Sequence, residues 1–404
     1  MKKIKEEPID LKIRKRHEIV RIIIAIIITA IITYFCTISI TLKSYLKTSG
    51  MTYLSTKLGL INQKLEDIYI YDLNEDKMIE NAIKGYVDGI DDKYTTYLTK
   101  EDMAELLEDT TGNYVGIGVY LANNTADNTI LIIGVIEGSV AEEVGLQPGD
   151  IIDKVEGIKY SGEQLDTVSE IFKGKEEGTE VNITIIRDSE EKELTIRRSS
   201  VRIKSVSSEM KSNNIGYIKI SSFNEGTANE FKEAYESLKN QNLTGLVIDL
   251  RNNGGGLVSE SLAIAETMVE KGKTLLITAN KANKEETETS KENPIVDVPV
   301  VILVNQNTAS ASEILAGTLR DNCNYKIIGT TSYGKGVIQT IYSFADGSGL
   351  KITSEEYFTP NHSTINKVGI IPDIEVKLDS EWENISNIPY ENDLQLQKAI
   401  SELD

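Results

Sequence analysis

The pattern of hydrophobic and polar positions divides the chain into four segments. The run 22–42 contains no charged residue and is dominated by isoleucine. Residues 43–110 carry apolar residues at helical spacing. From residue 112 the pattern changes to short β-branched runs with glycines between them, which is typical of strands. From residue 215 short apolar runs alternate with helical stretches, which indicates an α/β layer with a mainly parallel sheet.

The run Ile22–Leu42 predicts one transmembrane helix, because 21 residues at about 1.5 Å rise each roughly match a hydrocarbon core of about 30 Å. Segment 1–21 is basic, with Lys2, Lys3, Lys5, Lys12, Arg14, Lys15, Arg16 and Arg21. The positive-inside rule keeps such a cluster in the cytoplasm, so we expect the remainder of the chain outside. A cleaved signal peptide is the alternative, but Tyr34–Ser39 offers no small-residue cleavage site, which favours an uncleaved signal anchor.

Residues 43–110 are expected to form a small helical region, with helices over Glu75–Tyr86 and Lys100–Glu108. Two interpretations of this region stay open at the sequence level. It is either a spacer between the membrane and the rest of the chain or a surface for self-association.

Composition excludes several classes of protein. The chain has 404 residues, 40% hydrophobic and 26% charged, so it is long enough for several folded domains. Its net charge is −20; the first 43 residues carry nine Lys and Arg against four Asp and Glu, which leaves −25 for the rest. Such an acidic chain is not a general nucleic-acid binder. Two cysteines, Cys36 and Cys323, and two histidines, His17 and His362, exclude a Cys/His zinc site, and we expect no metal.

Residues 111–200 read as a small β domain, with strands expected at 114–121, 130–135, 150–155 and 181–187 and a helix at 163–172. Within it, Gly145 can end a short helix, Pro148-Gly149 makes a turn and Asp150 leads into a strand. This segment, Ala141–Gly157, resembles the PDZ domain. PDZ domains bind an extended peptide as an added strand, and a glycine-containing loop receives the terminal carboxylate.

The resemblance puts that peptide-binding loop at Tyr114-Val115-Gly116-Ile117-Gly118. By itself the pattern Gly-x-Gly more often marks a bulge or bend in a strand. Together with the PDZ signature downstream, we interpret the loop as a peptide-binding site.

Residues 201–378 predict the α/β domain. Its strands are expected at 215–220, 245–250, 298–304 and 325–329, and its helices at 227–239, 259–269 and 310–320. The polar stretch 278–293 is an exposed hairpin or a flexible segment that covers the domain, and 379–404 ends in a helical stretch at 394–403. Ligands of such sheets bind beyond the carboxyl ends of the strands, where three motifs occur.

The first two motifs are Asp249–Gly256 and Val304–Glu313, each running from a strand into a helix. Three consecutive glycines at 254–256 can present backbone N–H groups to an anion, although a plain glycine turn explains them equally well. Ser310 would stand at a helix N-terminus, where a developing negative charge is favoured. The simpler interpretation of this serine, and of its neighbours Thr308 and Ser312, is an N-cap.

The third motif, Gly329–Gly336, almost matches a phosphate-binding loop, but Gly336 replaces the hydroxyl residue that would hold magnesium. The following residues, 337–344, are β-branched and aromatic rather than helical, so we reject nucleotide hydrolysis. A serine nucleophile needs a base. His362 lies in a polar turn, whereas Lys335 has glycines and apolar residues around it and can serve if burial lowers its pKa.

The ordered motifs are similar to those of the carboxyl-terminal processing peptidases, also called tail-specific proteases. The resemblance runs from about residue 75 to the end and also includes Tyr94–Thr99, Tyr357–Pro360 and Val368–Glu375. It implies a crotonase-like α/β core and a serine endopeptidase with a Ser/Lys pair and no cofactor. By this resemblance the nucleophile is Ser310, the base is Lys335, and Gln339 orients the lysine. Thr308 stands where the family has the first serine of its pattern, a departure that precedes the nucleophile.

The resemblance further implies an oxyanion hole made by the N–H of Ala311 and that of Gly255 or Gly256. The substrates would be extracytoplasmic proteins with exposed C-terminal tails, captured by a PDZ domain that can gate the active site. The family often dimerises through its ends, which favours self-association of the helical segments. The alternative function is a membrane-tethered, non-catalytic PDZ adaptor, against which the presence of Ser310, Lys335 and Gln339 argues.

Overall fold

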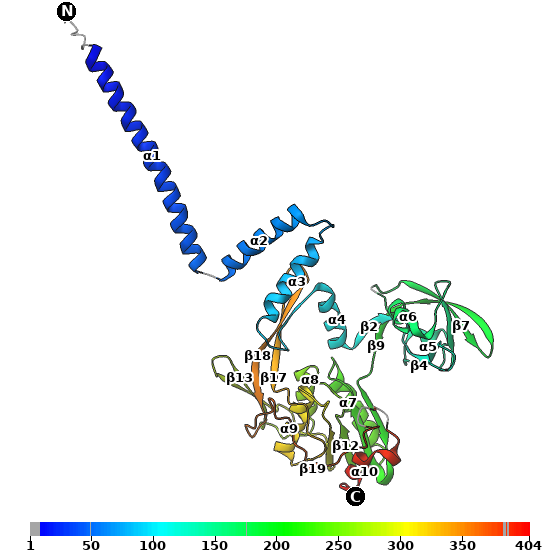
Figure 1. The fold of residues 1–404 in the computed structure, drawn as a ribbon. Coiled ribbons are helices and arrows are strands. Elements are labelled where there is room, and N and C mark those ends of the chain that lie inside the picture. Colours follow the sequence, from blue (N-terminus) through cyan, green and yellow to red (C-terminus); the bar gives the residue numbers. More distant parts are fainter. Residues whose placement is uncertain (1–8, 49, 175, 383–384, 386–387) are drawn as a thin grey trace, which may run out of the picture. The chain divides into compact units, whose positions relative to one another are not determined.

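The computed structural model describes residues 9–48, 50–174, 176–382, 385 and 388–404. These residues form two units that divide between Ile79 and Glu80, within α3 (Glu75–Asp88) (Figure 1). Lys2, Lys3 and Lys5 of the basic N-terminal cluster lie outside the described residues.

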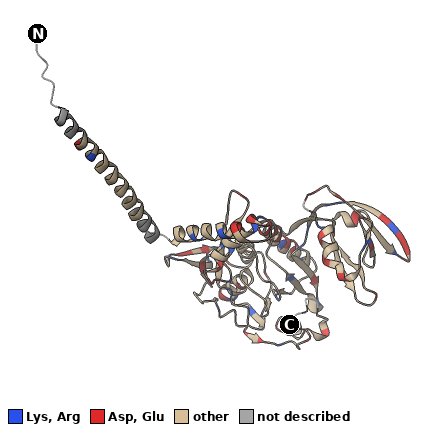
Figure 2. Cartoon of the chain, turned by 45° about the horizontal axis from the view of Figure 1, so that its top comes forward, with Lys and Arg blue, Asp and Glu red and all other residues tan. Residues whose placement is uncertain are grey.

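The first unit contains the long helix α1 (Ile9–Thr48) and the helix α2 (Gly50–Ile68). Within α1, the stretch Val20–Ile40 is the one described segment that is long and apolar enough to cross a membrane, and none of it is buried in the protein. Figure 2 shows this stretch as an almost uninterrupted tan ribbon, because Arg21 is the one charged residue between Val20 and Ile40. The predicted span 22–42 is therefore confirmed as a candidate anchor helix. A signal sequence would meet the same criteria of length and composition.

The β domain is a six-stranded sheet in the order β3-β4-β5-β7-β8, with β6 paired to β5 and a buried core of Ile, Val and Phe side chains. A separate two-stranded pair, β2 with β9, adjoins it. The elements are β2 (Asn113–Gly116), β3 (Val119–Asn124), β4 (Thr129–Val135), α5 (Val140–Glu143), β5 (Ile151–Val155), β6 (Ile158–Lys159), α6 (Leu165–Phe172), β7 (Glu180–Arg187), β8 (Glu190–Arg197) and β9 (Ser199–Arg202).

The expectation of one strand over 114–121 was wrong, because the structure has two strands there. Gly118 has φ of +89°, a conformation that interrupts a β-strand and that L side chains rarely adopt. The chain therefore turns between β2 and β3, and the two strands join different sheets.

The α/β domain is built on a six-stranded sheet in the order β10-β11-β12-β15-β16-β19, parallel from β11 onward. β12 (Gly245–Asp249) and β15 (Val300–Val304) are buried at every residue, as continuous apolar runs in a parallel sheet require. The other strands are β10 (Val206–Met210), β11 (Ile215–Ile220), β16 (Lys326–Gly329) and β19 (Ile374–Glu375). The predicted alternation of strands and helices is confirmed.

Helices cover both faces of this sheet. Side chains of α7 (Thr227–Lys239), α8 (Val258–Ala265) and α9 (Ala311–Cys323) share one core with Ile218, Ile248 and Ile302 of the sheet. On the other face, α10 (Leu394–Ser401) packs Leu396, Ala399 and Ile400 against Val247, Val301 and Leu303. The apolar side of the predicted C-terminal helix is thus covered by its own chain.

A second, antiparallel sheet has the order β1-β18-β13-β14, with β17 paired to β18. Its strands are β1 (Thr96–Leu98), β13 (Thr274–Asn280), β14 (Glu285–Thr289), β17 (Val337–Ser343) and β18 (Gly349–Phe358), and α4 (Lys100–Thr111) follows β1. β13 and β14 pair as a hairpin that includes residues 278–289 of the predicted polar segment 278–293, so the hairpin interpretation is confirmed for that part. β1 joins the predicted helical region to β18, a pairing that sequence analysis did not anticipate.

Candidate active site

The three sequence motifs meet at the carboxyl ends of three adjacent parallel strands, β12, β15 and β16. Hydrogen bonds tie the loops to one another. Ala309 N donates to Asn253 O at 3.0 Å, and Tyr333 N donates to Thr308 O at 2.9 Å. The structure thereby brings the glycine motif, the serine motif and the lysine motif into one site, as the α/β interpretation predicts.

Ser310 stands between β15 and α9 with φ of +56° and ψ of −119°. A non-glycine residue rarely adopts this conformation, and such strain is maintained only when the surroundings determine it. Ser310 N donates to Glu313 Oε2 at 2.8 Å, which caps the first turn of α9. The residue is half-buried, so its hydroxyl lies at a helix N-terminus within reach of a ligand.

The fully buried Glu313 joins the serine loop to the lysine loop. Besides Ser310 N, its carboxylate accepts hydrogen bonds from Lys335 N at 2.9 Å, Gly334 N at 2.7 Å and Ser332 Oγ at 2.5 Å. Glu313 was not among the residues for which the sequence predicts a role. The spacing Ser-x-x-Glu at 310–313 was the available signal, since it matches a capping box.

Lys335 lies in the loop after β16, and both its backbone N–H and its backbone carbonyl are hydrogen-bonded. Its N–H donates to Glu313, and the hydroxyl of Tyr357 donates to its carbonyl oxygen. Burial lowers the pKa of the Lys335 ammonium below its usual value, and the positive charge of Lys351 lowers this pKa further. A lysine in this environment is easier to deprotonate than an exposed one.

Within the described residues, no hydrogen bond joins Ser310 Oγ to Lys335 Nζ. The lysine ammonium instead lies 4.9 Å from the centroid of the Tyr94 ring. Gln339, on β17, places its Nε2 3.5 Å from Val337 O and makes no described hydrogen bond to Lys335. The orienting role that the resemblance implies for Gln339 stays a prediction.

The two candidate oxyanion glycines differ in their hydrogen bonds. Gly255 N donates to Asn253 Oδ1 at 2.8 Å, so this N–H is already used. Among the described residues no acceptor is recorded for Gly256 N or for Ala311 N, the latter at the first position of α9. A Cβ at Gly255 would lie 2.9 Å from both Ala309 O and Ser310 Cβ, so only glycine fits beside the serine.

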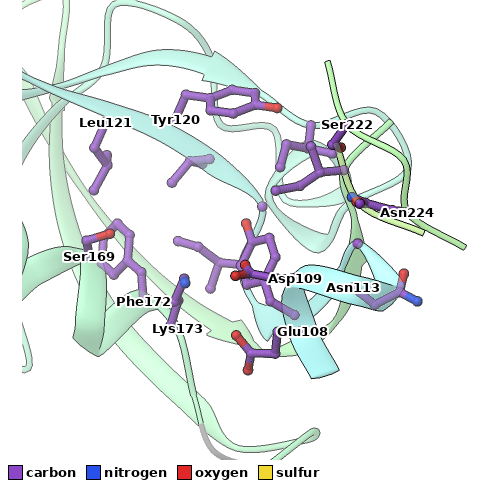
Figure 3. A pocket seen from close by; sticks show the side chains of 18 of the residues that line it. Glu108, Asp109, Asn113, Tyr120, Leu121, Ser169, Phe172, Lys173, Ser222 and Asn224 are labelled. Carbon is purple, nitrogen blue, oxygen red and sulfur yellow. The ribbon is translucent and has the colours of Figure 1, made fainter. Parts of the chain in front are cut away.

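A cavity of about 600 Å³ contains part of the predicted peptide-binding loop (Figure 3). Tyr114, Ile117 and Gly118 line it, whereas Val115 and Gly116 do not; Tyr114, Val115 and Gly116 all pair with β9. Val119 and Leu121 of β3 and Phe172 of α6 supply apolar walls, and Gly254–Gly256 also line the cavity. Among the described strands β3 pairs only with β4, so its other edge is free to accept an added strand.

His362 lies in the turn after β18, where its Nε2 is 3.0 Å from Glu285 Oε1 and its ring stacks on Phe358. Neither partner belongs to the serine or lysine loop. The structure therefore offers no described contact by which His362 could act as the base for Ser310.

Comparisons with known proteins identify the family. Residues 214–376 match peptidase family S41, and residues 131–187 match the PDZ domain. The carboxy-terminal processing protease CtpA of Bacillus subtilis strain 168 is 34% identical over 335 residues, covering 83% of this chain and 70% of that protein. The chain belongs to peptidase family S41. Its resemblance to the carboxyl-terminal processing proteases, stated above from motifs, is thereby confirmed.

A second relative is named as a CtpA-like serine protease, from Staphylococcus haemolyticus strain JCSC1435, and is 37% identical over 335 residues. That match covers 82% of this chain and 66% of the relative, so the chain spans about two thirds of its length. A solved structure from Bacteroides fragilis NCTC 9343, named as a candidate S41 protease, matches with a TM-score of 0.52 and 18% identity, covering 83% of this chain and 92% of that one. This structural likeness supports the S41 fold.

Proposed function

We propose that the protein is a membrane-anchored serine endopeptidase that cleaves proteins near their C-termini with Ser310 as nucleophile and Lys335 as general base. The observation that carries this proposal is the buried Glu313 carboxylate, which binds the N–H groups of both residues. A single anionic group thus positions the two loops against each other. An S41 protease needs such a pairing because a serine hydroxyl is a weak nucleophile without a base.

In the proposed mechanism, neutral Lys335 accepts the proton of the Ser310 hydroxyl while Oγ attacks the substrate carbonyl carbon. The carbonyl oxygen becomes an oxyanion that accepts hydrogen bonds from the N–H groups of Ala311 and Gly256. The lysine ammonium then gives its proton to the leaving amine as the peptide bond breaks, which leaves an acyl-enzyme. Water resolves the acyl-enzyme with the lysine again acting as base.

Three features support the assignment of the base to lysine. Burial and the charge of Lys351 both lower the pKa of Lys335, which increases its neutral fraction near neutral pH. His362 is engaged by Glu285 and Phe358. Gln339 lies on β17, four residues beyond the lysine, and could orient the amine after a change of its side-chain rotamer.

The PDZ domain is proposed to capture the substrate tail in the cavity beside β3. The free edge of β3 can pair with an extended peptide, and the apolar walls suit apolar side chains near the C-terminus. Figure 3 shows Lys173 among the residues of this cavity; its ammonium lies 5.5 Å from the centroid of the Tyr114 ring and can attract the terminal carboxylate. Because Gly254–Gly256 line the same cavity, a bound tail would lie close to the catalytic loops.

We further propose a topology with the N-terminus in the cytoplasm and residues after the anchor outside, since basic residues precede the apolar helix. The acidic balance of the rest of the chain would not attract it to an anionic membrane. The helix is therefore the expected attachment to the membrane.

The test uses the full-length chain in detergent micelles with an unfolded protein as substrate. Ser310→Ala and Lys335→Ala should each abolish cleavage while binding of a fluorescent C-terminal peptide persists. Ser343→Ala and Lys271→Ala, changes of the same type at exposed positions, serve as controls. Full cleavage by either active-site variant would refute the Ser/Lys mechanism. Binding without cleavage by the unaltered protein would instead support the adaptor.

A further inference from the structure

A tyrosine ring lies against the lysine proposed as the general base. The Lys335 ammonium is 4.9 Å from the centroid of the Tyr94 ring, within the range of a cation–π interaction. Tyr94 comes from the segment between α3 and β1, far from the serine and lysine motifs in sequence. Neither the resemblance nor the proposed mechanism gives this residue a role.

The fold holds the Tyr94 segment in place at several points. The Asp92 carboxylate accepts hydrogen bonds from Thr95 Oγ1 at 2.6 Å, Thr353 Oγ1 at 2.7 Å and Tyr94 N at 3.2 Å. Immediately after it, β1 pairs with β18, with Thr96 opposite Lys351. Since β17, which continues from the lysine loop, pairs with the same strand, the ring and the lysine are attached to one sheet.

Several charged or titratable groups surround the lysine. Lys93 lies 4.7 Å from the Tyr94 ring centroid on the same segment and donates a hydrogen bond to Tyr333 Oη at 2.8 Å. Lys351 on β18 and Glu313 on α9 also act on Lys335 electrostatically. Glu313 directs its oxygens to backbone and hydroxyl donors. In the described part of the chain, the Lys335 ammonium therefore contacts the Tyr94 ring and has no described hydrogen bond or ion pair.

We propose that Tyr94 is a positioning residue that holds the protonated Lys335 side chain against its ring in the resting enzyme, away from Ser310. This inference rests on the proposed Ser/Lys function. The negative face of an aromatic ring attracts an ammonium and not a neutral amine. Loss of the proton therefore weakens the contact and releases the amine, which can then turn to the serine hydroxyl. The position of the lysine side chain therefore depends on whether its amine is protonated.

The test compares pH profiles of kcat/KM for the full-length chain in detergent micelles, together with the rate at which a fluorophosphonate probe labels Ser310. Tyr94→Leu keeps an apolar side chain but removes the ring. The kinetic pKa of the base should fall by about 0.5 to 1 unit, because the lost attraction favoured the ammonium. Below the wild-type kinetic pKa, both rates should rise by roughly three- to tenfold at a given pH.

Tyr94→Phe restores the ring without the hydroxyl and should return the kinetic pKa to the wild-type value. Tyr342→Leu, the same change at an exposed position of β17, is the matched control. A Tyr94→Leu profile that coincides with wild type, or that moves to higher pH, would overturn the inference. The second outcome would mean that the ring only shields the lysine from water.

Replacement of Tyr94 by fluorinated phenylalanines preserves the shape of the ring and serves if the leucine variant does not fold. Fluorination weakens the negative face stepwise, so the kinetic pKa should fall with each added fluorine. A kinetic pKa that is independent of fluorine number would refute the proposal. Lys335→Ala separates the two hypotheses: an active alanine variant refutes the Ser/Lys function, whereas an inactive one with unaltered Tyr94 profiles refutes this inference alone.

Discussion

Glu313→Gln is the sharpest perturbation of the link between the two catalytic loops. Glu313 Oε2 accepts from Ser310 N and Lys335 N, and Oε1 accepts from Gly334 N and Ser332 Oγ. All four partners point a donor at the carboxylate. A glutamine amide can accept hydrogen bonds at its oxygen only. In one orientation its NH₂ group faces the N–H groups of Ser310 and Lys335, and in the other it faces the N–H of Gly334 and the hydroxyl of Ser332.

The magnitude follows from these contacts. At least two hydrogen bonds to a charged group are removed or inverted, and such bonds contribute about 1.5 to 3 kcal/mol each. We therefore expect the free energy of unfolding to decrease by about 3 to 6 kcal/mol if the loops keep their positions. If they separate instead, Ser310 and Lys335 lose their alignment, and kcat should fall by roughly 100-fold for a displacement of about 1 Å.

Thermal unfolding and steady-state proteolysis of the full-length variant measure both effects, with Glu233→Gln on the exposed side of α7 as the control. The pH profile adds a third readout. Because the Glu313 charge raises the pKa of Lys335, its loss should move any residual activity toward lower pH. A Glu313→Gln enzyme with the stability and kcat of wild type would refute the role of this carboxylate.

Three further predictions concern Asp393, the pH dependence of the wild type and Gly118. Asp393→Asn should lower the free energy of unfolding by about 1.5 to 3 kcal/mol in chemical denaturation, because it weakens the hydrogen bonds from the buried Arg251 guanidinium while Arg251 keeps its ion pair with Asp249; an unchanged midpoint would contradict this. The kcat/KM of the wild type should rise with pH through a lysine pKa below its usual value, since the base is the unprotonated amine; a flat profile would exclude Lys335 as base. Gly118→Val should abolish binding of a C-terminal peptide measured by fluorescence polarisation, because φ is +89° and a Cβ would lie 2.2 Å from Ser139 Cβ; retained affinity would refute the assignment of the loop.

Much of the fold could be predicted because its signals are local. An uncharged isoleucine-rich run is sufficient to indicate the apolar part of α1. The buried strands β12 and β15 appear in the sequence as continuous apolar runs followed by helices, so the parallel sheet and the edge at which its motifs meet follow from known rules. The boundaries of the domains, which fall in less patterned stretches, remain predictions.

The remaining features depend on contacts between residues far apart in sequence. The pairing of β1 with β18, and with it the position of Tyr94 over Lys335, joins segments about 250 residues apart and leaves no periodic signal. The break between β2 and β3 depends on one glycine with positive φ inside an apparently continuous strand pattern. Motif resemblance supplied the roles of Ser310 and Lys335, but only the geometry distinguishes Gly255, whose N–H is used, from Gly256.

The site also explains how a buried carboxylate can stand beside a lysine base without disabling it. An ion pair between Glu313 and the Lys335 ammonium would raise the pKa of the lysine and keep it protonated. The Glu313 oxygens are instead taken by three backbone N–H groups and one hydroxyl, so the carboxylate holds the loops through dipoles rather than through the ammonium. Burial then remains the dominant influence on Lys335 and lowers its pKa. In this arrangement the Lys335 ammonium contacts the Tyr94 ring instead of a carboxylate. Because a ring attracts an ammonium more weakly than a carboxylate does, the lysine can lose its proton at a moderate pH and act as a base.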